Sequence, residues 1–149
     1  MRPIWRAMRM FGLALTLIAA SGPAAVAATQ VSVVLEDQST RVGIQGMRME
    51  ATPDTVKAGR VELTVKNASQ AVVHELLLVK APAGGKPPYD DRAQRIVENR
   101  LVKLIDIDDI PPGRSVRKVV TLPPGTYEML CNQPGHYAQG MHTAFSVTP

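Results

Sequence analysis

The strongest signal in this sequence spans residues 125–141, which read GTYEMLCNQPGHYAQGM. The first part of this stretch alternates, so Tyr127, Met129 and Cys131 would share one face of a β-strand. The large apolar neighbours on that face predict that Cys131 points into the protein core. The cysteine is therefore expected to be buried.

The residues that follow predict a tight return of the chain. Pro134-Gly135 favours a turn that brings His136 back toward the cysteine, and Gly140 permits a second bend before Met141. One short segment thus supplies a thiol, an imidazole and a thioether. These soft nitrogen and sulfur donors are typical of a copper site.

The composition excludes several other kinds of site. The 149 residues contain one cysteine and three histidines, so no intramolecular disulfide, no paired-cysteine redox motif and no four-cysteine zinc or iron–sulfur site can form. Two copper centres joined by paired cysteines and multicopper oxidase sites are excluded by the same counts. A hydrophobic fraction of 45% indicates a globular chain.

A second histidine is needed for the trigonal two-histidine, one-cysteine geometry of blue copper. The candidates are His74 and His142. His142 directly follows Met141, and adjacent residues in a strand point to opposite faces, so His142 is expected to face solvent. His74 lies in an apolar segment expected to form a central strand. We therefore predict His74 as the fourth ligand.

This pattern resembles the small blue copper proteins, the cupredoxins, and within that family the rusticyanin and sulfocyanin groups. The resemblance rests on the Cys-x-x-Pro-Gly-His-x-x-x-Gly-Met motif of residues 131–141 and on an upstream His74 after a Val-Lys-Asn turn. It implies an all-β Greek-key sandwich that holds one type 1 copper ion. By the same resemblance, His74, Cys131 and His136 are equatorial ligands and Met141 is the axial ligand.

One position departs from the family pattern. Many cupredoxins have Asn or Ser after the first histidine, where its side chain ties the two ligand-bearing segments together, but this chain has Glu75. Asn67 and Asn132 are the candidates for a similar tether. The departure bears on the reduction potential rather than on the metal itself.

The rest of the chain reads as short strands separated by turns. Alternating or β-branched runs predict strands at residues 30–36, 44–50, 60–66, 71–80, 104–107, 113–122, 125–131 and 141–148. Residues 81–109 interrupt this succession of short strands and turns. A short helix is expected there, capped by Asp90 or Asp91, with the apolar residues Ala93, Ile96, Val97 and Leu101 on one face.

The N-terminal segment has the three parts of a secretory signal peptide: arginines, an apolar run and small residues before Ala27. We expect cleavage after Ala27, leaving one copper-binding domain at residues 28–149 in the periplasm, with no stable membrane insertion. The formal charge of +4 then falls to +1, because Arg2, Arg6 and Arg9 leave with the segment. Nucleic-acid binding loses its main support.

The expected function is electron transport by an exported, non-enzymatic copper protein cycling between Cu(II) and Cu(I). Its partner would be a redox protein such as a cytochrome or oxidase, bound transiently. A periplasmic copper-handling or oxidase-accessory module would use the same ligands. A catalytic Cys–His pair is an alternative chemistry, but it gives the Pro-Gly and Gly-Met positions no role. Zinc could also bind the same donors, but adventitiously.

Two further residues are candidates for additional metal binding. Met47 and Met49 lie two positions apart, so they would share a strand face and could bind Cu(I) at the surface. Packing in the core is the favoured interpretation of both methionines.

Overall fold

The computed structural model describes residues 27–40 and 43–149, and this part of the chain consists mainly of strands. The elements are β1 (Thr29–Thr40), β2 (Gly43–Thr52), β3 (Thr55–Lys57), β4 (Gly59–Asn67), β5 (His74–Lys80), β6 (Tyr89–Asp90), β7 (Arg95–Ile96), the 3-10 turn η1 (Glu98–Arg100), β8 (Lys103–Ile110), β9 (Ser115–Leu122), β10 (Gly125–Leu130) and β11 (His142–Thr148). No helix within the described ranges is long and apolar enough to cross a bilayer. The expected leader, residues 1–27, lies outside the described residues except for Ala27.

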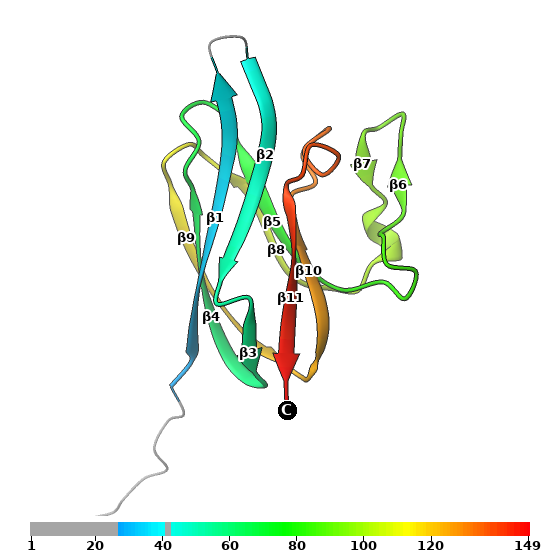
Figure 1. Ribbon diagram of the computed structural model, residues 1–149. Helices are drawn as coiled ribbons and strands as arrows, with labels where there is room; N and C mark the ends of the chain where they lie inside the picture. The colour runs from blue at the N-terminus through cyan, green and yellow to red at the C-terminus, as the bar shows by residue number, and fades with distance from the viewer. Residues whose placement is uncertain (1–26, 41–42) are drawn as a thin grey trace, which may run out of the picture.

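Two sheets pack face to face as a sandwich (Figure 1). One sheet has the strand order β2-β1-β4-β9, and the other has the order β3-β11-β10-β5-β8. β1 pairs in parallel with β4 and antiparallel with β2, while β10 pairs antiparallel with both β5 and β11. Strands far apart in sequence are therefore neighbours, and the predicted Greek-key β-sandwich is confirmed.

The core follows the side-chain alternation of the strands. In β4, Val61, Leu63 and Val65 are fully buried, as the period of two predicts. Met47 and Met49 of β2 also lie in this core, which agrees with packing as their main role.

β5 differs from the other strands because both of its faces are covered. Leu76 and Leu78 face the core between the sheets. Leu77 and Val79 face outward and pack with Ile96 of the insertion and with Leu130. The chain near His74 is thus held on both sides.

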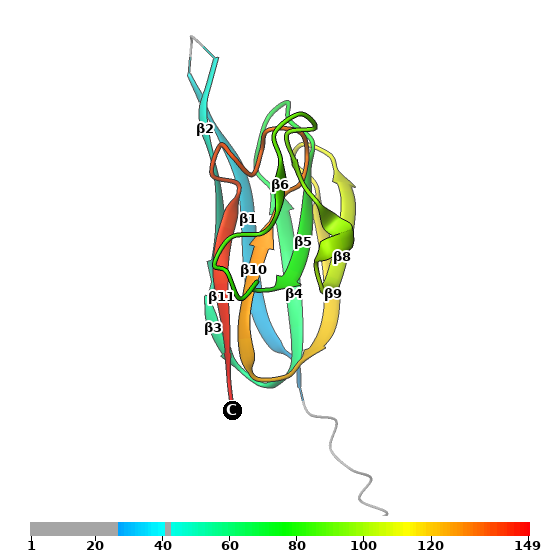
Figure 2. The same ribbon diagram turned by 90° about the vertical axis from the view of Figure 1, so that its right-hand side faces the viewer.

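The prediction of a helix in residues 81–109 is wrong. The segment forms the two-stranded hairpin β6–β7 and the single turn η1, which lie outside the second sheet (Figures 1 and 2). Asp90 Oδ1 does accept the N–H groups of Arg92 and Ala93, at 2.9 and 3.0 Å, like a helix cap. Gln94, with φ 54°, then turns the chain back, and Ile96 is buried against the sheet. Tertiary burial of Ile96 outweighs the helical spacing.

Candidate metal centre

Three donor side chains meet at one end of the sandwich. His74 begins β5, Cys131 directly follows β10, and His136 lies in the loop between β10 and β11. The Nδ1 atoms of the two histidines are 3.2 Å apart, and Cys131 Sγ lies 3.4 Å from Nδ1 of His136 and 3.9 Å from Nδ1 of His74. The three donor atoms all lie within 4.8 Å of one another. Among the residues that the structure describes, they form the one group of side chains close enough to hold a metal ion.

The loop that carries His136 is closed by backbone hydrogen bonds. The N–H of Met141 donates to the carbonyl of His136 at 3.0 Å, and the N–H of Cys131 donates to the carbonyl of Met141 at 2.9 Å. Gly140 has φ +100°, and a Cβ there would lie 2.9 Å from the carbonyl oxygen of Met47. Only glycine fits this approach of the loop to β2 without a shift.

The orientation of His74 is set by the segment before it. Ser69 Oγ lies 2.8 Å from Nε2 of His74, and the N–H of Ser69 donates to Asn67 Oδ1 at 2.9 Å. Asn67 Nδ2 donates to the carbonyls of Val72 and Ile110, each at 2.8 Å. With Nε2 bound to the hydroxyl, Nδ1 of His74 faces the other donors.

The two ligand-bearing segments are joined through Glu75 and Gln133. The N–H of Glu75 donates to Cys131 Sγ at 3.4 Å, and Gln133 Nε2 donates to Glu75 Oε2 at 3.4 Å. Of the two expected tethers, Asn67 holds the segment before His74. Asn132 instead bonds to β7 and η1.

Burial controls the protonation of the three donors. It lowers the pKa of His74 to about 4, an effect to which His136 adds, and it also lowers the pKa of His136. Burial raises the pKa of the Cys131 thiol to about 11 and the pKa of Glu75 to about 7. Both imidazoles are therefore neutral at pH 7 and able to bind a cation, whereas the thiol must lose its proton on metal binding.

Comparisons with known proteins agree with this geometry. No protein-family model and no curated protein sequence matches the chain. Auracyanin from the photosynthetic bacterium Roseiflexus castenholzii is 25% identical, with a TM-score of 0.53 over 79% of this chain and 97% of that one. Auracyanin A of Chloroflexus aurantiacus, a "blue" copper protein, is 22% identical, with a TM-score of 0.54 over 80% and 99%. Rusticyanin from Thiobacillus ferrooxidans is 20% identical, with a TM-score of 0.56 over 82% and 79%.

The chain has the cupredoxin fold. Within this cupredoxin fold, the two neutral imidazoles and the buried thiol fit one type 1 copper ion per chain, because copper takes such soft donors in a trigonal arrangement. Met141 is fully buried in the same core cluster as Cys131, and its backbone closes the loop. Its axial role stays a prediction.

His142 lies apart from the three donors of the cupredoxin site. Its Nδ1 is 3.3 Å from Glu128 Oε1, and its ring stacks on that of Tyr137 with centroids 4.4 Å apart. The Tyr137 hydroxyl donates to the same carboxylate oxygen at 3.0 Å. These contacts with Glu128 and Tyr137 agree with the prediction that the His142 side chain points away from the metal donors.

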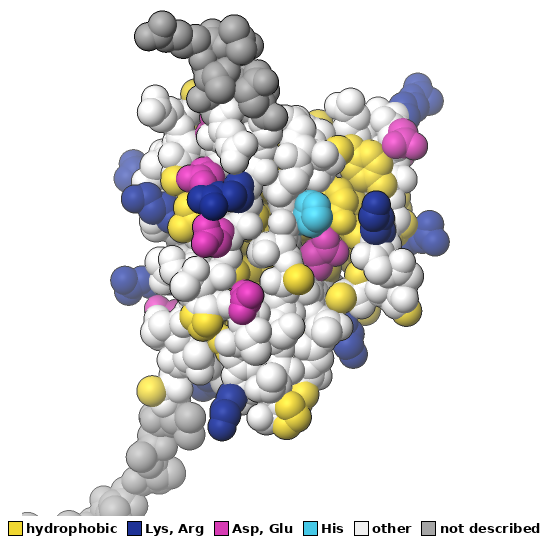
Figure 3. Space-filling view, in the orientation of Figure 1, with side chains coloured by type: hydrophobic (Ala, Val, Ile, Leu, Met, Phe, Trp, Pro, Cys, Tyr) yellow, Lys and Arg dark blue, Asp and Glu magenta, His cyan; other side chains and the backbone are white. Residues whose placement is uncertain are grey.

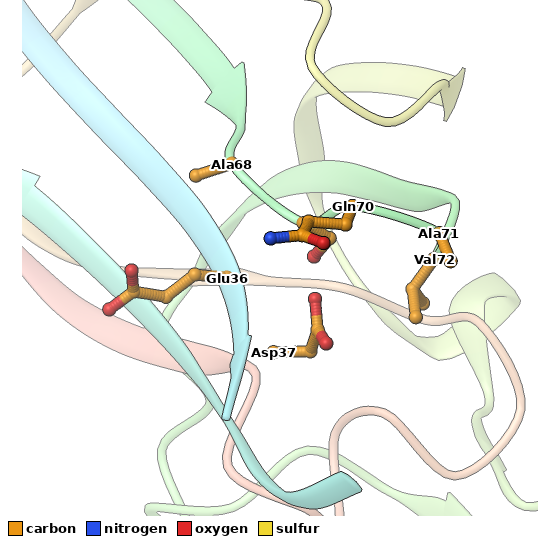
Figure 4. Close-up of a pocket in the computed structure, with 7 residues that line it drawn as sticks. Glu36, Asp37, Ala68, Gln70, Ala71 and Val72 are labelled. Atoms are coloured by element: carbon orange, nitrogen blue, oxygen red, sulfur yellow. The ribbon is translucent and has the colours of Figure 1, made fainter. Parts of the chain in front are cut away.

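A groove of about 520 Å³ lies beside the His74 segment, between β1 and the loop that follows β4 (Figure 4). In this view the Asp37 side chain points toward that loop, whereas the Glu36 carboxylate points away from it. Ser69 lines the groove, but none of the three donors does. The groove borders the hydroxyl that orients His74 without being the metal site.

Sequence reasoning missed Ser69 and Gln133. Ser69 precedes His74 by five residues in a turn, and Gln133 follows Cys131 by two, so both lie within the ligand-bearing segments. Their proximity to the expected ligands was the available signal. Their hydrogen-bond partners, however, depend on the tertiary structure.

Proposed function

We propose that this protein is a one-electron carrier that holds a single type 1 copper ion through His74, Cys131 and His136, with Met141 as the axial ligand. The observation that carries this proposal is the buried group of two facing Nδ1 atoms and one Sγ atom. When bound, copper supplies reversible one-electron chemistry between Cu(II) and Cu(I).

The chain's own residues prepare the site for either oxidation state. The Ser69 hydroxyl is hydrogen-bonded to Nε2 of His74 and so orients the ring. The N–H of Glu75 donates to the sulfur of Cys131. The cysteine is fully buried, which excludes water and favours the lower charge of the reduced state. A rigid donor set limits the rearrangement that accompanies electron transfer.

His136 is the point of closest approach for a redox partner. It is partly exposed, whereas His74, Cys131 and Met141 are fully buried. On the face shown in Figure 3, hydrophobic side chains gather where β6 and β7 lie in Figure 1, with both basic and acidic side chains around them. Such a surface suits a weak, transient contact with a cytochrome or an oxidase rather than catalysis on a substrate.

We further propose that the mature protein consists of residues 28–149 and acts in the periplasm. Cleavage after Ala27 leaves the whole of β1, which begins at Thr29 and pairs with Val61 there. Mass spectrometry of the protein from the periplasmic fraction is expected to give a chain that begins at Ala28. An intact N-terminus in the membrane fraction would contradict export.

The copper assignment is tested by visible and electron paramagnetic resonance spectra after addition of Cu(II). The wild-type protein should bind one equivalent and show the strong copper–thiolate absorption of a type 1 site. Cys131→Ser should abolish that absorption, because the sulfur ligand is lost. His142→Gln is the matched control, since this histidine lies apart from the donors. Colour in the Cys131→Ser variant would refute the assignment.

Electron transfer is separated from copper handling by stopped-flow measurement. Rapid, reversible reduction of the copper-loaded protein by a cytochrome is expected of a carrier. Transfer of the copper ion itself to a chelating acceptor protein, without such reduction, would support copper handling instead.

A further inference from the structure

The insertion between β5 and β8 lies directly against the ligand loop. We call residues 89–101 the strap; it comprises β6, β7 and η1. In Figures 1 and 2 the strap lies outside the second sheet, at the end of the sandwich where the loop between β10 and β11 emerges. Ile96 of the strap belongs to one hydrophobic cluster with Leu130, which precedes Cys131, and Tyr137, which follows His136, packs against this cluster. The strap and the loop thus share one small hydrophobic cluster.

Asn132 is the main polar contact between the strap and the loop. Its Oδ1 accepts the N–H of Ile96 at 2.5 Å, and its Nδ2 donates to the carbonyl of Ile96 at 3.0 Å and to Glu98 Oε1 at 2.8 Å. The side chain is 1% exposed, and it pairs with Ile96 as a neighbouring strand would. A buried amide whose oxygen and nitrogen are both bonded specifies one orientation.

A second contact holds the loop immediately before His136. The N–H of Gly135 donates to the carbonyl of Gln94 at 2.8 Å. Gln94 has φ 54°, a conformation uncommon for a residue other than glycine, at the point where the hairpin turns back. The residue with this unusual backbone conformation, Gln94, is thus the one whose carbonyl accepts the hydrogen bond from the loop.

Asn132 and Gly135 are the first and last of the residues that separate Cys131 from His136 in the chain. We propose that the strap positions His136 relative to Cys131 and that Asn132 is the positioning residue through which it does so. This inference rests on the proposed function, because it assigns the strap to the copper site. Residues 89–101 are then a part of the metal centre that no ligand motif includes.

The metal-free protein tests the proposal by amide hydrogen exchange. Asn132→Ala removes all three bonds, so the N–H groups of His136 and Met141 should exchange at least roughly tenfold faster through local opening of the loop. Val79→Ala is the matched control, because it removes buried packing from the same cluster and no polar contact. Equal exchange of the loop amides in the two variants, at equal global stability, would overturn the proposal.

The copper-loaded protein gives a second readout. Asn132→Ala should change the relative intensities of the copper–thiolate bands and shift the reduction potential, whereas Val79→Ala should leave both unchanged. Asn132→Ser keeps a hydroxyl that can form one of the three hydrogen bonds without adding a charge, so its spectrum should fall between those of wild type and Asn132→Ala. It also replaces the alanine variant if that variant does not fold. Wild-type spectra and potential in both Asn132 variants would overturn the proposal.

These outcomes separate the inference from the proposed function. A wild-type protein that forms no coloured copper site would refute the proposed function. The exchange measurement uses the metal-free protein and would still show whether the strap holds the loop. A coloured wild-type site combined with an unaffected Asn132→Ala variant would refute only the positioning role.

Discussion

The Ser69 hydroxyl lies 2.8 Å from Nε2 of His74, on the side of the ring opposite the other donors. Burial lowers the pKa of His74 to about 4, so the ring is neutral at pH 7 and carries one N–H. Placing that hydrogen on Nε2, as a donor to the hydroxyl, leaves the Nδ1 lone pair directed at the metal site. A single side chain thereby sets both the tautomer and the orientation of a ligand.

Ser69→Ala is therefore expected to weaken copper binding by roughly 10- to 100-fold, as is usual when a hydrogen-bond partner of a metal-bound histidine is lost. Competition with a chelator of known affinity measures the change. Ser115→Ala, at an exposed site on β9, is the control and should bind copper as the wild type does. Equal affinity in the two variants would show that Ser69 does not orient His74.

Met141 is fully buried beside the cysteine, and its thioether is the weakest of the expected donors. Met141→Leu should keep the visible colour and raise the reduction potential, because an apolar side chain stabilises Cu(II) less than a thioether does. Redox titration measures this. Met49→Leu is the control for a buried methionine in the same core. A potential that moves no more in Met141→Leu than in Met49→Leu would exclude an axial role.

The loop between β10 and β11 is an element whose shape depends on glycine. Gly140 has φ +100° and approaches the carbonyl of Met47, while the N–H of Met47 donates to the carbonyl of Gln139 at 3.0 Å. The loop is thus attached to β2 as well as to the strap. Several elements hold the segment that carries His136 and Met141.

Gly140→Ala should destabilise the protein by about 1–3 kcal/mol, because alanine is strained at this φ and its Cβ would meet the Met47 carbonyl. Urea unfolding of the metal-free protein measures the loss. Gly84→Ala is the control, since a Cβ at Gly84 meets nothing within 4 Å. If Gly140→Ala lowered the free energy of unfolding no more than Gly84→Ala does, the loop would accommodate the added Cβ without strain.

The insertion shows where local pattern and tertiary packing diverge. Asp90 caps a turn as expected from a helix start, and the apolar spacing after it suits one face of a helix. Ile96, however, gains more by packing on Leu77 and Leu130 and by pairing with Asn132. Its pairing partner is 36 residues away in the chain, a separation that no local pattern reports.

At the scale of the whole molecule, the metal site joins parts of the sandwich that fold from distant segments. His74 and Cys131 are 57 residues apart and meet because β5 pairs with β10 in the same sheet. A ligand that binds only this assembled arrangement stabilises the folded state. The stability of the protein should therefore depend on copper.

Copper at a free concentration about 100-fold above its dissociation constant should add roughly 2.7 kcal/mol to the free energy of unfolding. Thermal unfolding with copper, and again after its removal by a chelator, measures this effect. Cys131→Ser should lose most of the increase, because the thiolate ligand is gone. An equal rise in Tm for this variant and the wild type would place the bound copper elsewhere on the protein.

Residue order alone predicted the sandwich and indicated that His74, Cys131 and His136 would meet, because most of its signals are local. Alternation within each strand identified the buried faces, and Cys131, His136 and Met141 lie within eleven consecutive residues. His74 was found because the chain has so few histidines. The tertiary structure decided what surrounds these donors: the Ser69 hydroxyl on His74, the Glu75–Gln133 link and the hold of the strap on Asn132. These contacts depend on which strands pair and in what register, and burial then determines whether each polar group finds a partner.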